Sequence, residues 1–173
     1  MPSNVGTTTA AEFSPLLVIG MGVDVFASEW RYCDRVSSYV ARMVSHDRTD
    51  SLLYSNLFSS ALNELLETVF RYHGAEGELS CRVLRDGPRD CIELRIPCDA
   101  DAKAFFVDAA RLLGRRDVAD HYRAALFAEG PLDPRMGLLE LCVDYAADIR
   151  IDTIDSGIVL TAQFNLEGEP VHA

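Results

Sequence analysis

The segment SLLYSNLFSSALNELLETVFRYHG, residues 51–74, carries the strongest structural signal in the chain. Apolar side chains recur along one side of it at helical spacing. They are Leu53, Leu57, Ala61, Leu65 and Phe70, and Leu62, Leu66 and Val69 widen the stripe. Asp50 or Ser51 can cap the amino end, and Gly74 suits the left-handed conformation that closes many helices. The segment therefore predicts one long helix that buries a broad face.

Short apolar segments on either side of this helix predict strands. They lie at residues 16–19, 79–84, 91–96, 149–154 and 158–166. Turn-forming residues at 85–90 and at 155–157 join the later strands into two hairpins. Further helices are expected to begin near Ser28, Asp99, Asp117 and Met136. Paired strands separated by helices predict an α/β fold, a two-layer sandwich in which helices cover one face of a mixed, mainly antiparallel sheet.

The size and charge of the chain narrow the classes of protein. Its 173 residues fit a single domain, expected at residues 13–167 between flexible tails at 1–12 and 168–173. A net charge of −11 argues against a nucleic-acid binder and against docking on anionic membranes. No apolar run is long enough to span a bilayer and no secretion signal is present, so a cytoplasmic location is expected. Five cysteines without C-x-x-C spacing are expected to be reduced core thiols.

Polar residues inside the long helix are candidates for chemistry. Glu64 and Thr68 are four residues apart and therefore share a helix face. A carboxylate with a hydroxyl one turn away can activate water or bind Mg²⁺. The same spacing also occurs on ordinary solvated helix rims, and the two residues alone leave both interpretations open.

Two segments resemble the GHKL superfamily of histidine-kinase-like ATPases. Asn63-Glu-Leu-Leu-Glu-Thr-Val-Phe-Arg-Tyr72 is similar to the N-box helix of that superfamily. Arg135-Met-Gly-Leu-Leu-Glu-Leu-Cys-Val-Asp-Tyr145, with the two strands that follow it, is similar to the glycine-containing helix and the closing hairpin. The expected order of elements also fits. Most of the chain resembles small bacterial regulatory kinases of the SiaB type and of the anti-sigma-factor type.

The resemblance implies an ATP and Mg²⁺ site. Glu64 falls on the catalytic base of the serine/threonine kinase members and Thr68 on the metal-binding asparagine, so these two would hold Mg²⁺. Arg71 falls on a lysine of the N-box. Asp99, or alternatively Asp101, would replace the carboxylate that contacts adenine. Arg135 and Gly137 would contact phosphates at the start of a helix.

Three departures from the family pattern imply a degenerate nucleotide site. Thr68 replaces an asparagine, residues 97–101 lack the expected glycines, and Arg135 replaces a glycine. The resemblance therefore implies a bacterial signalling regulator that acts on a regulatory protein partner by partner switching. An active ATP-dependent serine/threonine protein kinase is the alternative, and an unrelated small-molecule enzyme is a third class. Homodimerisation is also expected if Trp30, Tyr32 and Tyr39 are exposed rather than buried in the core.

Overall fold

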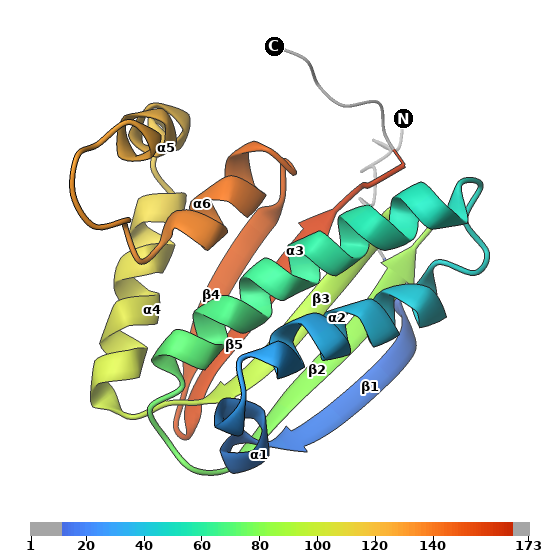
Figure 1. The fold of residues 1–173 in the computed structure, drawn as a ribbon, viewed down its shortest axis with the longest axis horizontal. Helices are drawn as coiled ribbons and strands as arrows, with labels where there is room; N and C mark the ends of the chain where they lie inside the picture. Colours follow the sequence, from blue (N-terminus) through green and yellow to red (C-terminus); the bar gives the residue numbers. More distant parts are fainter. Residues whose placement is uncertain (1–11, 168–173) are drawn as a thin grey trace, which may run out of the picture.

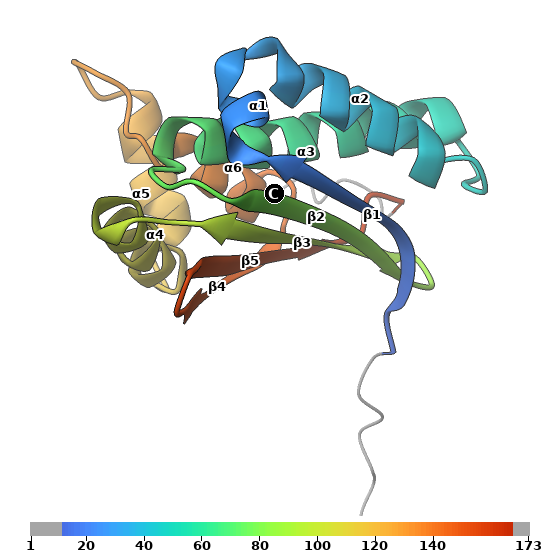
Figure 2. The same ribbon diagram turned by 90° about the horizontal axis from the view of Figure 1, so that it is seen from below.

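A five-stranded antiparallel sheet forms one layer of the protein, and helices cover one of its faces (Figures 1 and 2). The computed structural model describes residues 12–167. Its elements, in chain order, are β1 (Ser14–Gly22), α1 (Val23–Ser28), α2 (Arg31–Val44), α3 (Ser51–Tyr72), β2 (Glu78–Asp86), β3 (Arg89–Pro97), α4 (Ala100–Leu113), α5 (Val118–Leu126), α6 (Met136–Val143), β4 (Asp148–Ile154) and β5 (Gly157–Phe164). The predicted two-layer α/β sandwich is therefore confirmed.

The strands follow the order β1-β2-β3-β5-β4, and all four neighbouring pairs are antiparallel. The sheet is thus more uniform than the mixed arrangement that the sequence suggested. β2–β3 and β4–β5 are the two predicted hairpins. β1 pairs with β2, and β5 with β3, across long connections in the sequence. β1 lies at one edge of the sheet and β4 at the other (Figure 1).

Alternation along the strands separates a buried sheet face from a polar one. One row across the buried face is entirely apolar and runs through Ile19, Cys81, Leu94, Leu160 and Ile151. The neighbouring row on the opposite face is mostly polar and runs through Val18, Arg82, Glu93, Thr161 and Arg150. The helices pack on the apolar side, where they complete the core.

The long helix α3 follows the sequence prediction at both ends. The Asp50 carboxylate accepts a hydrogen bond of 3.0 Å from the backbone N–H of Leu53, and Gly74 adopts a left-handed φ of +57°. The predicted stripe is wrong in the first two turns. Tyr54 and Phe58 are buried there, whereas Leu53 is 54% exposed. The larger aromatic side chains fill the space over the sheet, and this turns the buried face by one residue.

The first helical region also differs from the prediction. Ser28 was expected to cap a helix, but it lies at the end of the short helix α1, where its hydroxyl donates a hydrogen bond to the Val25 carbonyl. The next helix begins at Arg31 without a side-chain cap. A six-residue helix is too short to show a clear periodicity in sequence, so α1 could not be recognised.

All five cysteines are free thiols, as the sequence predicted, and four of them are buried. Tails were predicted at 1–12 and 168–173, and residues 1–11 and 168–173 lie outside the described residues. Between residues 12 and 167, no helix combines the length and the apolar character needed to cross a bilayer.

Candidate functional site

The two segments that carry the family resemblance lie in direct contact. Helix α3 brings Glu64 against the first turn of α6, where Gly137 is buried. A Cβ atom placed on Gly137 would lie 2.7 Å from Glu64 Oε2 and 3.5 Å from Thr68 Oγ1. The absence of a side chain at Gly137 therefore lets the two helices approach closely, and Glu64 occupies the space that a side chain would otherwise fill.

Thr68 takes part in the packing of its own helix. Its hydroxyl donates a hydrogen bond of 3.0 Å to the backbone carbonyl of Glu64, and the residue is 1% exposed. A hydroxyl in this position has its proton committed to the preceding turn. Binding of Mg²⁺ by Thr68 would require the α3–α6 contact to open.

Carboxylates gather around this contact. Burial raises the pKa of Glu64, and the negative charges of Glu140 and Glu67 raise it further. Burial and the charge of Asp144 likewise raise the pKa of Glu140. The Tyr122 hydroxyl donates a hydrogen bond of 2.7 Å to Asp144. We call the contact between Glu64 and Thr68 of α3 and Gly137 of α6 the seam. The electrostatic environment of the seam is negative, which disfavours the phosphates of a nucleotide.

Arg135 is held by two other carboxylates. Its guanidinium makes a bidentate pair with Asp133, with two N···O distances of 2.9 Å, and a third contact of 2.8 Å with Asp108 of α4. Arg135 thus ties the loop before α6 to α4. The bidentate geometry fixes the guanidinium in orientation and occupies most of its donors.

Asp99 and Arg71 also have structural partners. Asp99 caps α4 by accepting a hydrogen bond of 2.8 Å from the backbone N–H of Ala102, and its carboxylate lies against Gly74. Arg71 pairs with Glu67 at 3.4 Å and lies over the Trp30 ring, 5.0 Å from its centroid. Both side chains stabilise the ends of helices.

The structure therefore brings together Glu64, Thr68 and Gly137 and gives Arg71, Asp99 and Arg135 partners of their own. Four surface cavities have volumes of about 390, 280, 500 and 430 Å³, and none of them is lined by Glu64, Thr68 or Gly137. The cavity of about 500 Å³ is lined in part by Arg135 and Asp133. Within residues 12–167, no group of three or more histidine, cysteine, aspartate or glutamate side chains is arranged to hold a metal ion. The chemistry that remains at the seam is that of one half-buried carboxylate, Glu64.

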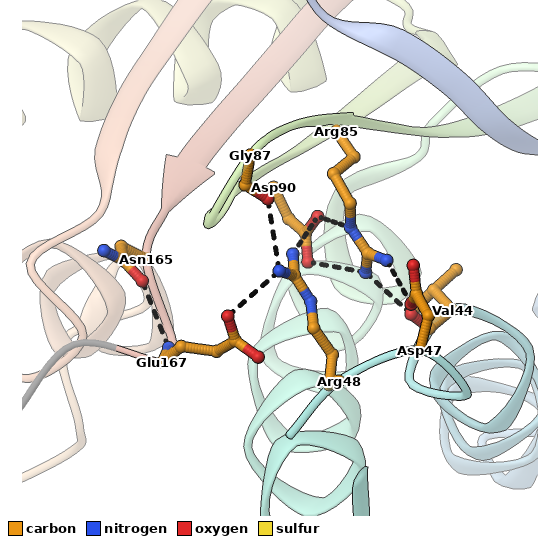
Figure 3. Close-up of polar contacts among 8 residues, drawn as sticks. All are labelled: Val44, Asp47, Arg48, Arg85, Gly87, Asp90, Asn165 and Glu167. Carbon is orange, nitrogen blue, oxygen red and sulfur yellow. Dashed lines mark hydrogen bonds and ion pairs between the residues drawn. The ribbon is translucent and has the colours of Figure 1, made fainter. Parts of the chain in front are cut away.

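A buried ionic cluster at the far end of α3 was not predicted from the sequence (Figure 3). Asp90 is the second residue of β3 and is 1% exposed. Arg85 Nε lies 2.7 Å from Asp90 Oδ1, and Arg48 Nη2 lies 3.1 Å from the same oxygen. Two guanidiniums therefore share one buried carboxylate.

The same arginines reach three further segments. Arg85 donates hydrogen bonds of 2.6 Å to the Val44 carbonyl and of 2.6 Å to Asp47. Arg48 donates to the Gly87 carbonyl and to Glu167, both at 3.1 Å. The cluster fastens the α2–α3 turn and the chain after β5 to the β2–β3 hairpin. The turn-forming residues 85–90 were recognised in the sequence, but nothing in their pattern indicated that they contact the turn between α2 and α3.

The Arg135–Asp133 pair predicts a specific loss of stability in acid. Hydrogen bonding to Arg135 lowers the pKa of Asp133 from its ordinary value to about 2, although burial opposes this. Because the folded-state pKa is depressed, the contribution is complete above about pH 4 and is lost as the pH falls towards 2. We expect about 2 kcal/mol from this pair. The free energy of unfolding in urea, measured at pH 5 and at pH 2.5, should fall less for Asp133→Asn than for the wild type.

Asp120→Asn is the control for this measurement, because Asp120 is 80% exposed and pairs with Arg123 at the surface. It should leave the dependence on pH unchanged. An Asp133→Asn variant that loses as much stability in acid as the wild type would show that the pair with Arg135 contributes nothing.

Comparison of the chain with protein-family models, with curated proteins and with solved structures gave no match. The function proposed below therefore depends on the geometry of the seam and on the resemblance of its two segments to the GHKL superfamily.

Proposed function

We propose that the protein is a bacterial signalling regulator that acts by binding a regulatory protein partner, on a histidine-kinase-like scaffold whose nucleotide site is degenerate. The contact between Glu64 and Gly137 carries this proposal. The two segments that resemble the N-box and the glycine-containing helix are neighbours, as a GHKL scaffold requires. In the family that they resemble, phosphates bind at the start of the second helix, and here Glu64 packs against that turn.

The partners of the other residues support the same conclusion. The Thr68 hydroxyl is bonded within α3, and Arg135 is held by Asp133 and Asp108. The carboxylates of Glu67 and Glu140 surround Glu64 and oppose the approach of a triphosphate. In a degenerate site of this kind the fold is kept, but the residues that would bind Mg-ATP in an active kinase stabilise the fold instead.

The proposal predicts that Mg-ATP does not bind. Isothermal titration of the full chain with Mg-ATP should give no binding heat up to millimolar nucleotide, because the seam is closed and negatively charged. Glu64→Ala is a useful second sample, because it removes the carboxylate that fills the seam. This variant should oppose nucleotide binding less than the wild type does, although it gains no metal ligand. One-to-one binding of Mg-ATP to the wild type with micromolar Kd would overturn the degenerate site.

Such binding would favour the alternative, an active serine/threonine protein kinase. One observation favours this second candidate: the Glu64 carboxyl makes no hydrogen bond or ion pair within residues 12–167, and burial raises its pKa, as suits a general base. Transfer of labelled phosphate from ATP to a candidate antagonist protein, abolished by Glu64→Ala, would establish the kinase and assign its base.

A further inference from the structure

Helix α2 lies along the outer flank of the helical layer, beside α3 (Figure 1). Its buried side packs on α3 and the core through Cys33, Ser37, Val40, Ala41 and Val44. A second set of apolar residues occurs at helical spacing about a third of a turn away, and consists of Tyr32, Val36, Tyr39 and Met43. Tyr39 is 56% exposed and Met43 is 55% exposed. Tyr32 and Val36 are half-buried and pack partly against the core, so Tyr39 and Met43 form the exposed part of this stripe. Exposed apolar side chains one turn apart indicate an interaction surface.

Two exposed arginines border this stripe. Arg35 is one turn from both Tyr32 and Tyr39, and Arg42 is one turn from Tyr39. The two arginines are two turns apart, so they share one line of the helix at a spacing of about 10 Å. Neither makes an ion pair with any residue in the range 12–167, although the chain carries 27 acidic residues and a net charge of −11. Helix α2 therefore carries unpaired positive charge beside exposed apolar side chains, in a strongly acidic protein.

An antiparallel pair of α2 helices from two copies of the chain fits this surface poorly. A two-fold contact of that kind would pair Tyr32 with Met43 and Val36 with Tyr39 of the other copy. The same arrangement brings Arg35 of one copy next to Arg42 of the other. Like charges placed opposite one another across an interface are strongly unfavourable.

Nucleic acid also fits poorly. Two arginines on one helix can neutralise only a few phosphates, whereas the net charge of −11 repels the rest of the polymer. The apolar stripe would remain exposed in such a complex. A protein segment that offers both carboxylates and apolar side chains satisfies both features of α2.

We infer that the exposed face of α2 binds an acidic amphipathic helix of a protein partner, with the partner's apolar side on the Tyr32–Met43 stripe and its carboxylates opposite Arg35 and Arg42. Helix-in-groove contacts of this type use apolar anchors at helical spacing, and the rim charges fix register and orientation. The assignment rests on the proposed function, because it names the face and the chemistry of the partner through which the regulator would act.

The test is a fluorescence-anisotropy titration of the full chain with two synthetic helical peptides of about 18 residues, long enough to form a helix on binding. Both carry leucines at the spacing of the α2 stripe; one has glutamates two turns apart beside them, and the other has lysines at the same positions. We expect the glutamate peptide to bind at least about tenfold more tightly than the lysine peptide, with an affinity that falls as salt increases.

Charge reversal on α2 provides the decisive comparison. Arg35→Glu combined with Arg42→Glu should invert the preference, so that the lysine peptide binds more tightly. Arg111→Glu combined with Arg116→Glu is the matched control, because both residues are exposed arginines of α4 and its following loop without ion pairs within the described range, and the net charge changes equally. This control should keep the preference for glutamate. Circular dichroism should show that both double variants are folded.

Several results would overturn the assignment. They are equal binding of the two peptides, binding of neither, a preference that the α2 reversal does not change, self-association of the chain abolished by Tyr39→Glu, and tighter binding of a short DNA duplex than of the glutamate peptide. The Mg-ATP titration is separate from these measurements. Nucleotide binding with an intact preference for the glutamate peptide would remove the proposed function and leave the α2 surface, whereas the reverse pattern would remove only the α2 surface.

Discussion

Asp90→Asn should lower the free energy of unfolding by about 3–5 kcal/mol, the cost of leaving buried charge without its counter-ion. Asp90 is 1% exposed, and the side chains of Arg48 and Arg85 are 7% and 11% exposed. Replacing the carboxylate by an amide of the same shape keeps the volume and removes the charge. Two guanidiniums would then remain in the protein interior, with only Asp47 and Glu167 nearby to compensate them.

The measurement is urea denaturation at pH 8. Burial raises the pKa of Asp90 to about 7, while the charge of Arg48 and its hydrogen bond oppose that rise, so the carboxyl is ionised at pH 8. Asp152→Asn is the matched control, because Asp152 is exposed on the edge strand β4 and should change stability by less than about 0.5 kcal/mol. A loss below about 1 kcal/mol in Asp90→Asn would show that the cluster is not a significant source of stability.

Gly157→Ala should be at least as damaging, with a loss of more than about 4 kcal/mol, which is exceptional for one methyl group. Gly157 begins β5 and is paired with Pro97 of β3. A Cβ atom here would clash with the Ile96 carbonyl oxygen and would lie 3.0 Å from the Cys98 backbone nitrogen. Both obstacles are backbone atoms, so relief requires separation of β3 from β5 at this end of their ladder.

Gly114→Ala provides the comparison for this variant. Gly114 has a φ of −79°, and its nearest obstacle is the Ala110 carbonyl oxygen at 3.5 Å, an ordinary contact. We expect it to unfold within about 1 kcal/mol of the wild type. Both variants should be followed by circular dichroism during thermal and urea denaturation. A Gly157→Ala protein as stable as Gly114→Ala would mean that the β3–β5 ladder can shift to accommodate the methyl group.

Local sequence signals predicted much of this fold. Asp50 and Gly74 mark the ends of α3 because capping depends only on neighbouring backbone groups. The hairpin around Gly87 was recognisable for the same reason. The burial of Tyr54 instead of Leu53 was not, because the two residues are adjacent and only the sheet beneath decides which of them faces inward.

The candidate site divides along the same lines. The family resemblance predicted that Glu64 and Gly137 belong to one site, and the two residues are in contact. The partners of Arg135 could not be inferred, because Asp108 lies on a different helix and Asp133 in an irregular loop. The pairing of Arg48 with Asp90 spans more than forty residues and has no periodic signal.

The sheet order has a consequence for how the chain reaches its native state. The β2–β3 and β4–β5 hairpins can close early, since each joins neighbouring strands through a short turn. β1 must wait for β2, and β3 for β5, because about sixty residues separate each pair and closing so long a loop is entropically costly. High contact order of this kind slows folding. A newly made chain would therefore pass through a stage at which β2 and β3 are joined while their outer sides still lack neighbours, the period when it most needs protection from association with other chains.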